Sequence, residues 1–279
     1  MKIAGGKSLP HSPVGLSLAV EKPNLLAWDG HGGMTLFNQA AEVVAETRFA
    51  GLLSASLSAD GNHAVALNQD GTLRFLGGNL AVRREVHAGG PCTAVAIDKQ
   101  GHNIAVGLQD GNIVFWNGNG QEGKRVQVPS PPASMAFATQ HPWLAFASAT
   151  GLAGCADTNG ALRWREGVPH HLGPIAMAGA TGAWYLPCRG GGLIRYGPLG
   201  APHKLMRHVP RCRLAASSRD ETILVVVADS PGELFLIRDP DQKPETLRVP
   251  ATITCLAMDP LGTMIMAGLD DRRILWIRP

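Results

Sequence analysis

The most regular feature of the sequence is a short apolar segment that follows a turn residue and recurs along the whole chain. Six glycines and one arginine take this turn position at intervals of 38 to 41 residues: Gly33, Gly71, Gly111, Gly151, Gly192, Gly232 and Arg272. The residues two and four positions further on are mostly apolar, such as Leu73 and Phe75. Because residues i, i+2 and i+4 of a strand share one face, this pattern predicts one half-buried strand per repeat.

Three further strands are predicted in each repeat. An apolar run rich in Ala, Ser and Thr precedes a turn, a second apolar run follows that turn, and a more polar run comes after the marked strand. In the third repeat these runs are TAVAI at 93–97, IAVGL at 104–108 and KRVQV at 124–128. No segment shows the 3.6-residue periodicity of a helix. The chain is therefore predicted to be all-β.

Seven units of four short antiparallel strands, repeated about every 40 residues, are typical of a β-propeller. We therefore predict a seven-bladed propeller that spans residues 1–279 as a single domain. The small residues of each first strand fit where blades converge on the axis. The last repeat ends after its third strand, at Pro279. We expect residues 2–9 to supply the missing fourth strand, since closing the ring this way removes two sheet edges.

Composition agrees with this architecture and excludes several classes. The chain has 34 Gly and 20 Pro, which favours many turns, and its 45% hydrophobic residues exclude a disordered chain. No uninterrupted apolar run approaches 18 residues, so we expect no membrane-spanning helix. Gly and Pro interrupt residues 1–20, which disfavours a signal peptide. The cysteines form no CxxC motif and are interpreted as buried thiols in a reducing cytoplasm: Cys92, Cys155, Cys188, Cys212 and Cys255.

One repeat resembles a known family. Residues 87–117 read HAGGPCTAVAIDKQGHNIAVGLQDGNIVFWN, with a His before a Gly-Pro, an Asp-Gly turn and a terminal Trp. This stretch resembles a WD40 repeat, and His87, Asp110 and Trp116 match three members of that family's structural tetrad. The Ser or Thr of the tetrad is absent, since Val106 and Leu108 occupy that stretch. The resemblance implies the propeller fold, and it implies that His87 and Asp110 form a hydrogen-bonded strut between loop and blade.

The sequence does not favour catalysis. It contains no HxH or HExxH metal motif and no GxSxG nucleophile motif, and its glycine runs lie between strands rather than before a helix. We therefore expect no catalytic residue, no cofactor and no metal, and a protein that is not an enzyme. The alternative is an enzyme or metal site where the central channel opens, which needs convergent carboxylates. The loops between second and third strands supply such residues, although tight turns also require them: Asp70, Asp110, Asp229 and Asp270.

Basic residues gather on the predicted outer strands. The net charge is only +3, and the densest basic segment is residues 203–213, HKLMRHVPRCR. Equivalent outer strands carry Arg83-Arg84, Lys124-Arg125 and Arg163. This repetition favours solvated strands that protect a sheet edge with charge. An acidic partner or nucleic acid is the alternative, but aromatic residues are not interleaved with the charges, so nucleic acid is not favoured.

The function predicted from these features is that of a cytoplasmic protein–protein interaction scaffold, because rigid loops on a closed ring bind with little ordering cost. We expect the partner surface on the face made by the second-to-third-strand and fourth-to-first-strand loops. Trp28, in the glycine-rich segment WDGHGG, is the candidate anchor; in the alternative it packs between blades, and its exposure separates the two. Charged and polar residues would surround it: His31, Asp70, Asp110, Arg189, Asp229 and Asp270.

Overall fold

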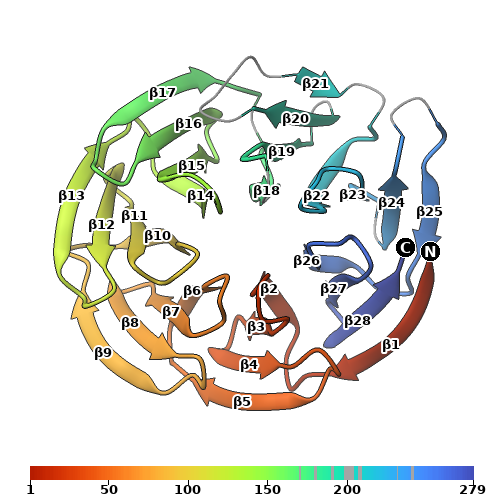
Figure 1. Cartoon of the computed structure of the whole chain (residues 1–279), viewed down its shortest axis with the longest axis horizontal. Helices are drawn as coiled ribbons and strands as arrows, with labels where there is room; N and C mark the ends of the chain where they lie inside the picture. The colour runs from red at the N-terminus through yellow and green to blue at the C-terminus, as the bar shows by residue number, and fades with distance from the viewer. Residues whose placement is uncertain are drawn as a thin grey trace.

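Seven antiparallel sheets of four strands each surround a central axis in the computed structural model of the chain (Figure 1). The structure describes residues 1–169, 171–178, 181–189, 192–197, 204–206, 209–230, 232–239 and 242–279. No helix occurs in this described part. The predicted all-β, seven-bladed architecture is confirmed.

Each blade takes its strands in order from the axis to the periphery. Blade 1 contains β2 (Pro13–Leu18), β3 (Leu25–Asp29), β4 (Gly33–Phe37) and β5 (Val43–Arg48). Blade 2 contains β6 (Leu52–Leu57), β7 (His63–Asn68), β8 (Thr72–Gly77) and β9 (Val82–His87). Blade 3 contains β10 (Cys92–Ile97), β11 (Asn103–Leu108), β12 (Asn112–Asn117) and β13 (Glu122–Gln127). Blade 4 contains β14 (Pro132–Phe137), β15 (Trp143–Ser148), β16 (Leu152–Asp157) and β17 (Leu162–Gly167).

The remaining blades follow the same plan, and the last one combines both ends of the chain. Blade 5 contains β18 (Ala176–Met177), β19 (Trp184–Cys188), β20 (Gly192–Tyr196) and β21 (Lys204–Met206). Blade 6 contains β22 (Cys212–Ser217), β23 (Leu224–Ala228), β24 (Glu233–Ile237) and β25 (Glu245–Arg248). Blade 7 contains β26 (Ile253–Met258), β27 (Ile265–Leu269), β28 (Arg273–Arg278) and β1 (Lys2–Ser8).

The core lies between neighbouring blades. Leu73 and Phe75 of β8 are buried as the alternation predicts, and they pack with Val95 and Val106 of blade 3 in one cluster. Leu76, on the opposite face of β8, is also buried and packs in a cluster with residues of blade 1. Because each blade is covered on both sides, its middle strands are apolar on both faces. The polar outer strands remain exposed, as β9 illustrates.

Five of the six turn glycines of the sequence repeat adopt the left-handed backbone conformation, and in blade 1 Gly32 adopts it in place of Gly33. Gly71 and Gly111 have φ values of 91° and 87°, which L-residues with a Cβ rarely adopt. A Cβ at Gly71 would also overlap the backbone of Gly90. The recurrence of glycine about every 40 residues therefore records a backbone requirement of the turn between the second and third strands.

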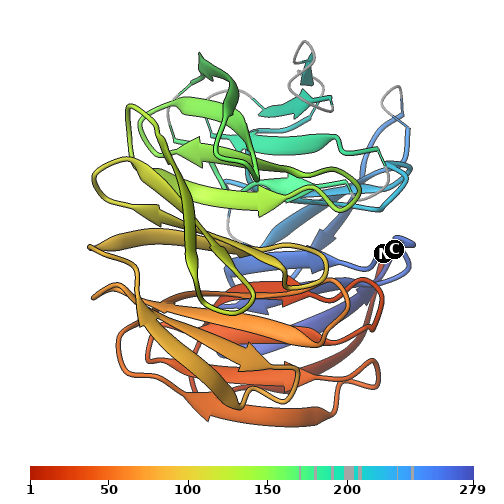
Figure 2. The same ribbon diagram turned by 60° about the vertical axis from the view of Figure 1, so that its left-hand side comes forward.

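The N-terminal segment closes the ring. β1 pairs with β28 in an antiparallel register from Lys2 opposite Arg278 to Ser8 opposite Arg273. The Leu9 amide extends this contact by donating to the Arg272 carbonyl over 2.7 Å. The two chain ends consequently lie side by side (Figures 1 and 2). The predicted closure by residues 2–9 is confirmed.

Candidate functional site

Trp28 ends β3 on the face that the sequence indicated. It is half-buried and packs against the apolar cluster between blades 1 and 2. Its indole lies against the Gly15 backbone so closely that a Cβ at Gly15 would overlap the ring. Trp28 thus contributes to packing between blades, and its part in binding a partner stays a prediction.

We expect Trp28→Ala to lower the free energy of unfolding by about 2 kcal/mol, because truncation removes buried indole surface and leaves a void over Gly15. Thermal or denaturant unfolding measures this loss. Unchanged stability would show that the indole is a free rim group rather than part of the packing between blades.

The aspartates of this face are engaged in their own turns. The Asp70 carboxylate accepts a hydrogen bond from the Thr72 amide over 2.8 Å, and Asp110 accepts one from the Asn112 amide over 2.9 Å. These backbone hydrogen bonds lower the pKa of both Asp70 and Asp110. Asp270 instead accepts from the Thr252 amide, which lies in the loop before β26, over 3.0 Å. Hydrogen bonds within the protein therefore account for these three carboxylates without a ligand.

Three of the predicted surface residues lie together on blades 5 to 7. The Arg189 guanidinium is 3.8 Å from the Asp229 carboxylate. Burial lowers the pKa of Arg213 on β22, as does the positive charge of Arg189, whereas Asp229 and Asp270 raise it. Arg213 thus interacts with Arg189, Asp229 and Asp270. His31 instead contacts His11 on blade 1, with ring centroids 4.1 Å apart.

The strut predicted for the WD40-like repeat exists, but with a different partner. His87 accepts a hydrogen bond at Nδ1 from the Gly89 amide over 3.1 Å, so Nε2 carries the proton and donates to the Asp70 carbonyl over 2.9 Å. Asp110 lies in the next blade, and there Gln127 donates to the Asp110 carbonyl over 3.0 Å. The expected pairing of His87 with Asp110 is therefore corrected: the end of each of these fourth strands holds the turn of its own blade.

Trp116 is buried, as its structural role requires, with 6% of its surface exposed. Its indole nitrogen has no hydrogen-bond partner among the described residues. The neighbouring strand β11 carries Val106 and Leu108 where the family has a hydroxyl, so it supplies no side-chain acceptor.

The basic segment 203–213 does not form a single outer-strand patch. Lys204 belongs to the outer strand β21, whereas Arg213 lies on β22, the innermost strand of blade 6, and donates to the Ile253 carbonyl. His203, Arg207 and His208 lie outside the described residues. Placing Arg213 with the outer strand was wrong, because the chain has already returned to the axis at Cys212.

A large hollow lies at the opposite end of the axis, and sequence reasoning missed it. A cavity of about 370 Å³ opens where the seven first strands end, next to their turns into the second strands. We call it the channel mouth. Its apolar lining includes half-buried side chains from four blades: Leu16, Leu18, Phe137, Ile175, Met177 and Leu256. The signal available in the sequence was a larger residue near the end of each first strand, whose other residues are mostly small.

Hydrogen bonds between adjacent blades hold the rim of the channel mouth. The Glu21 amide donates to the Ala59 carbonyl over 2.8 Å, and the Asp60 amide donates to the Lys99 carbonyl over 3.1 Å. The Lys99 ammonium also forms an ion pair with the Glu21 carboxylate over 2.6 Å. Blades 1, 2 and 3 are therefore joined at their first turns.

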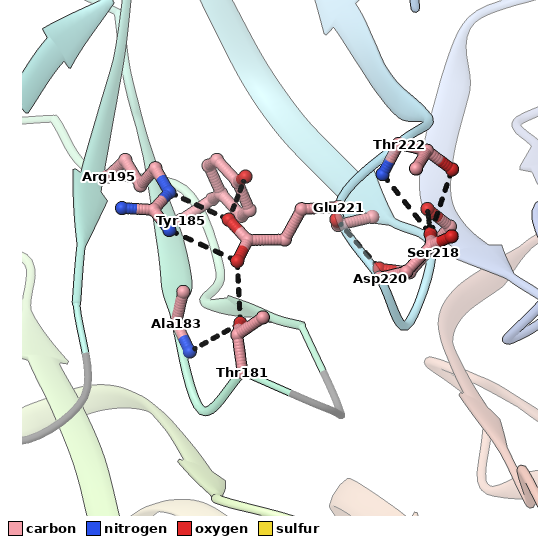
Figure 3. Close-up of polar contacts among 9 residues, drawn as sticks. Thr181, Ala183, Tyr185, Arg195, Ser218, Asp220, Glu221 and Thr222 are labelled. Carbon is pink, nitrogen blue, oxygen red and sulfur yellow. Dashed lines mark hydrogen bonds and ion pairs between the residues drawn. The ribbon is translucent and has the colours of Figure 1, made fainter.

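On the other side of the rim, Glu221 joins blade 6 to blade 5 (Figure 3). Its carboxylate accepts hydrogen bonds from Arg195 Nε over 2.7 Å, from the Tyr185 hydroxyl over 2.6 Å and from the Thr181 hydroxyl over 2.6 Å. Burial raises the pKa of Glu221, but these hydrogen bonds outweigh burial, and the pKa is lowered overall. We call this group the Glu221 clamp.

Glu221 occupies a backbone position that other blades give to glycine. Its φ is 63°, and the corresponding turn residues Gly61, Gly101 and Gly262 have φ values of 69°, 75° and 68°. An L side chain in this conformation costs roughly 1 kcal/mol. Blade 6 thus carries backbone strain that allows the carboxylate to reach blade 5.

Among the described residues, no three His, Cys, Asp or Glu side chains are grouped so that they could hold a metal ion. The same residues contain no helix with the length and hydropathy needed to cross a membrane.

Comparison with known families gives one match. The model of the WD domain, G-beta repeat, matches residues 80–117, which include β9 and the first three strands of blade 3. The matched stretch contains His87, Asp110 and Trp116, the residues that carried the resemblance. No curated protein matches the sequence. The chain is thus a seven-bladed β-propeller in which residues 80–117 match the WD40 repeat.

Proposed function

We propose that this propeller is a non-catalytic protein-interaction scaffold that receives an apolar segment of a partner protein at the channel mouth. WD40 propellers typically act as scaffolds of this kind. The location is supported by the cavity of about 370 Å³, which is lined by residues of all seven blades. Its volume falls in the range of sites that bind small ligands and side chains.

The chemistry of the channel mouth suits an apolar side chain with polar surroundings. Phe137, Met177 and Leu256 line its interior and are only partly covered. At the rim, Val20 is 39% exposed and Leu261, on the adjacent blade, is 78% exposed. A cluster of exposed apolar groups with a polar rim is a common mark of an interaction site.

The rigidity of the rim also supports binding at the channel mouth. The hydrogen bonds between first turns and the Glu221 clamp fix the rim before a partner arrives, which reduces the entropy that binding loses. The loop face that contains Trp28, His31 and Arg189 is the alternative location, and the same experiment separates the two faces.

We expect Val20→Lys combined with Leu256→Lys to abolish capture of a partner from native extract, because two ammonium groups would have to be buried at the interface. The control is Val82→Lys, which places one lysine charge on an outer strand at a residue that is 50% exposed. Both variants should unfold within a few degrees of the parent protein.

The location is supported when a protein retained by the parent and by Val82→Lys is lost from the double variant. Retention by the double variant, with loss on Arg189→Ala, would place the partner on the loop face instead. Turnover of a substrate at the channel mouth would contradict the non-catalytic role.

We place this function in the cytoplasm. The structure contains five free cysteines, all buried, and burial raises the pKa of the Cys92 thiol to about 11 and that of the Cys255 thiol to about 12. Unpaired, unreactive thiols of this kind are typical of a reducing compartment.

A further inference from the structure

A second cavity, of about 310 Å³, lies between blades 2 and 3. Its apolar walls come from Phe75, Ile97 and Ile104, and its edge is made by the turns around Gly101 and Gly118. It shares only Ile97 with the channel mouth. We call it the interblade pocket. What we infer from it does not depend on the function proposed above.

Two consecutive arginines of β9, Arg83 and Arg84, line the interblade pocket. Neighbouring residues of a regular strand point to opposite faces. Here Arg84 pairs opposite Phe75 and Val82 opposite Leu76, so Arg83 is the extra residue of a β-bulge. A bulge redirects a side chain and is common beside functional sites. It explains how both arginines reach one pocket.

The two guanidinium groups keep most of their hydrogen-bonding capacity. Arg83 Nη1 lies 3.3 Å from His63 Nδ1, and Arg84 Nη1 donates to the Asn119 carbonyl over 2.6 Å. Each guanidinium has five N–H donors. Neither arginine has a carboxylate partner among the described residues, and no acidic residue lines the pocket.

The arginine pair of blade 2 is not repeated in the next two blades. In blade 4, Arg163 follows the same bulge and lies 2.7 Å from the Asp157 carboxylate. The position of Asp157, at the end of the third strand, is Gly77 in blade 2. In blade 3, Gly123 and Lys124 take the positions of Arg83 and Arg84. If the arginines of blade 2 served only to solvate or protect the outer strand, an acidic partner could be present there, as it is in blade 4. Its absence from blade 2 is therefore not explained by either role.

We propose that the interblade pocket binds an aryl phosphate monoester, with the phosphate between Arg83 and Arg84 and the ring against the apolar walls. Two guanidinium charges match the charge of −1.5 to −2 that such a phosphate carries near pH 7. The planar fork of arginine suits phosphate oxygens in a bidentate arrangement. Phe75 and Ile97, which keep 6% and 8% of their surface exposed, supply the apolar contact for the ring.

The first experiment measures binding calorimetrically with phenyl phosphate, inorganic phosphate and benzoate at constant ionic strength. We expect phenyl phosphate to bind at least about tenfold more tightly than either of the others, because only it has both the dianion and the ring. A peptide with one phosphotyrosine distinguishes the source. Tighter binding of the peptide indicates a phosphorylated protein, and tighter binding of phenyl phosphate indicates a free metabolite.

The second experiment tests the residues. Arg83→Gln and Arg84→Gln should each weaken phenyl phosphate binding at least about tenfold, whereas Arg163→Gln, the matched outer-strand control, should leave it unchanged. Gly77→Asp should also abolish binding, since a Cβ at Gly77 lies 3.1 Å from Arg83 Nε and would bring a carboxylate to it. Thermal unfolding confirms that each variant is folded.

Three results would overturn the proposal. These are no phenyl phosphate binding at millimolar concentration, equal binding by folded Arg83→Gln and Arg84→Gln, and benzoate binding as tight as that of phenyl phosphate.

Discussion

Deleting residues 1–10 should lower the free energy of unfolding by about 3 to 6 kcal/mol, at a net 0.5–1.5 kcal/mol for each hydrogen bond lost. β1 forms six cross-strand residue pairs with β28, and the Met1 ammonium additionally contacts Glu245 over 3.0 Å. Removing it uncovers the edge of β28 and opens the ring between blades 7 and 1. The melting temperature should fall by roughly 10 °C or more.

A synthetic peptide of residues 1–10 provides the control. Added in excess to the truncated protein, it should restore part of the lost stability, because it can pair with the free edge of β28. Lys2→Ala with Lys7→Ala in the full chain should have little effect, since both side chains are exposed. Equal thermal unfolding of truncated and full-length protein would contradict the closure.

Removing the Glu221 clamp should have the second largest effect. Glu221→Ala should lower the free energy of unfolding by about 2 to 3 kcal/mol, because Arg195 and Tyr185 lose a charged partner in a partly buried place. Glu221→Gly loses the same contacts but relieves the left-handed backbone, so it should be less destabilising by about 1 kcal/mol. Asp220→Asn, at an exposed carboxylate of the same turn, is the control and should have a smaller effect.

The clamp also predicts how stability depends on pH. Because the pKa of Glu221 is lowered from 4.5 in the folded protein, its contribution is complete above pH 4.5 and is lost as the pH falls through the folded pKa. The stability difference between the parent and Glu221→Ala should therefore be large near pH 7 and shrink at about pH 3. A difference that stays constant over this range would show that the carboxylate is not the stabilising group.

The ring could be predicted from the sequence because the repeats of a propeller keep a constant spacing even where their residues differ. The turn glycines near every fortieth residue and the alternation in strands such as β8 each follow from local backbone geometry. The closure followed from a count: a chain with three strands in its last repeat needs a fourth one. The glycine spacing and the alternation depend on residues close together in the sequence, and the closure depends only on the number of strands.

The candidate sites could not be predicted in the same way, because they depend on contacts between repeats. The half-buried side chains of the channel mouth come from several first strands, and each looks like an ordinary strand residue within its own repeat. The same holds for Glu221, whose partners lie on blade 5. His87 shows the converse: the motif indicated a strut, but only the three-dimensional arrangement showed that its acceptor is the Asp70 carbonyl.

The central claim, that a partner protein binds at the channel mouth, is tested most directly by site-specific photo-crosslinking. A photoreactive amino acid is placed at position 20, at the rim, or at position 82, on the outer strand β9, and native extract is irradiated with each protein. We expect a discrete adduct from position 20 and none from position 82. No adduct at position 20, or the same adducts from both positions, would contradict binding at the channel mouth.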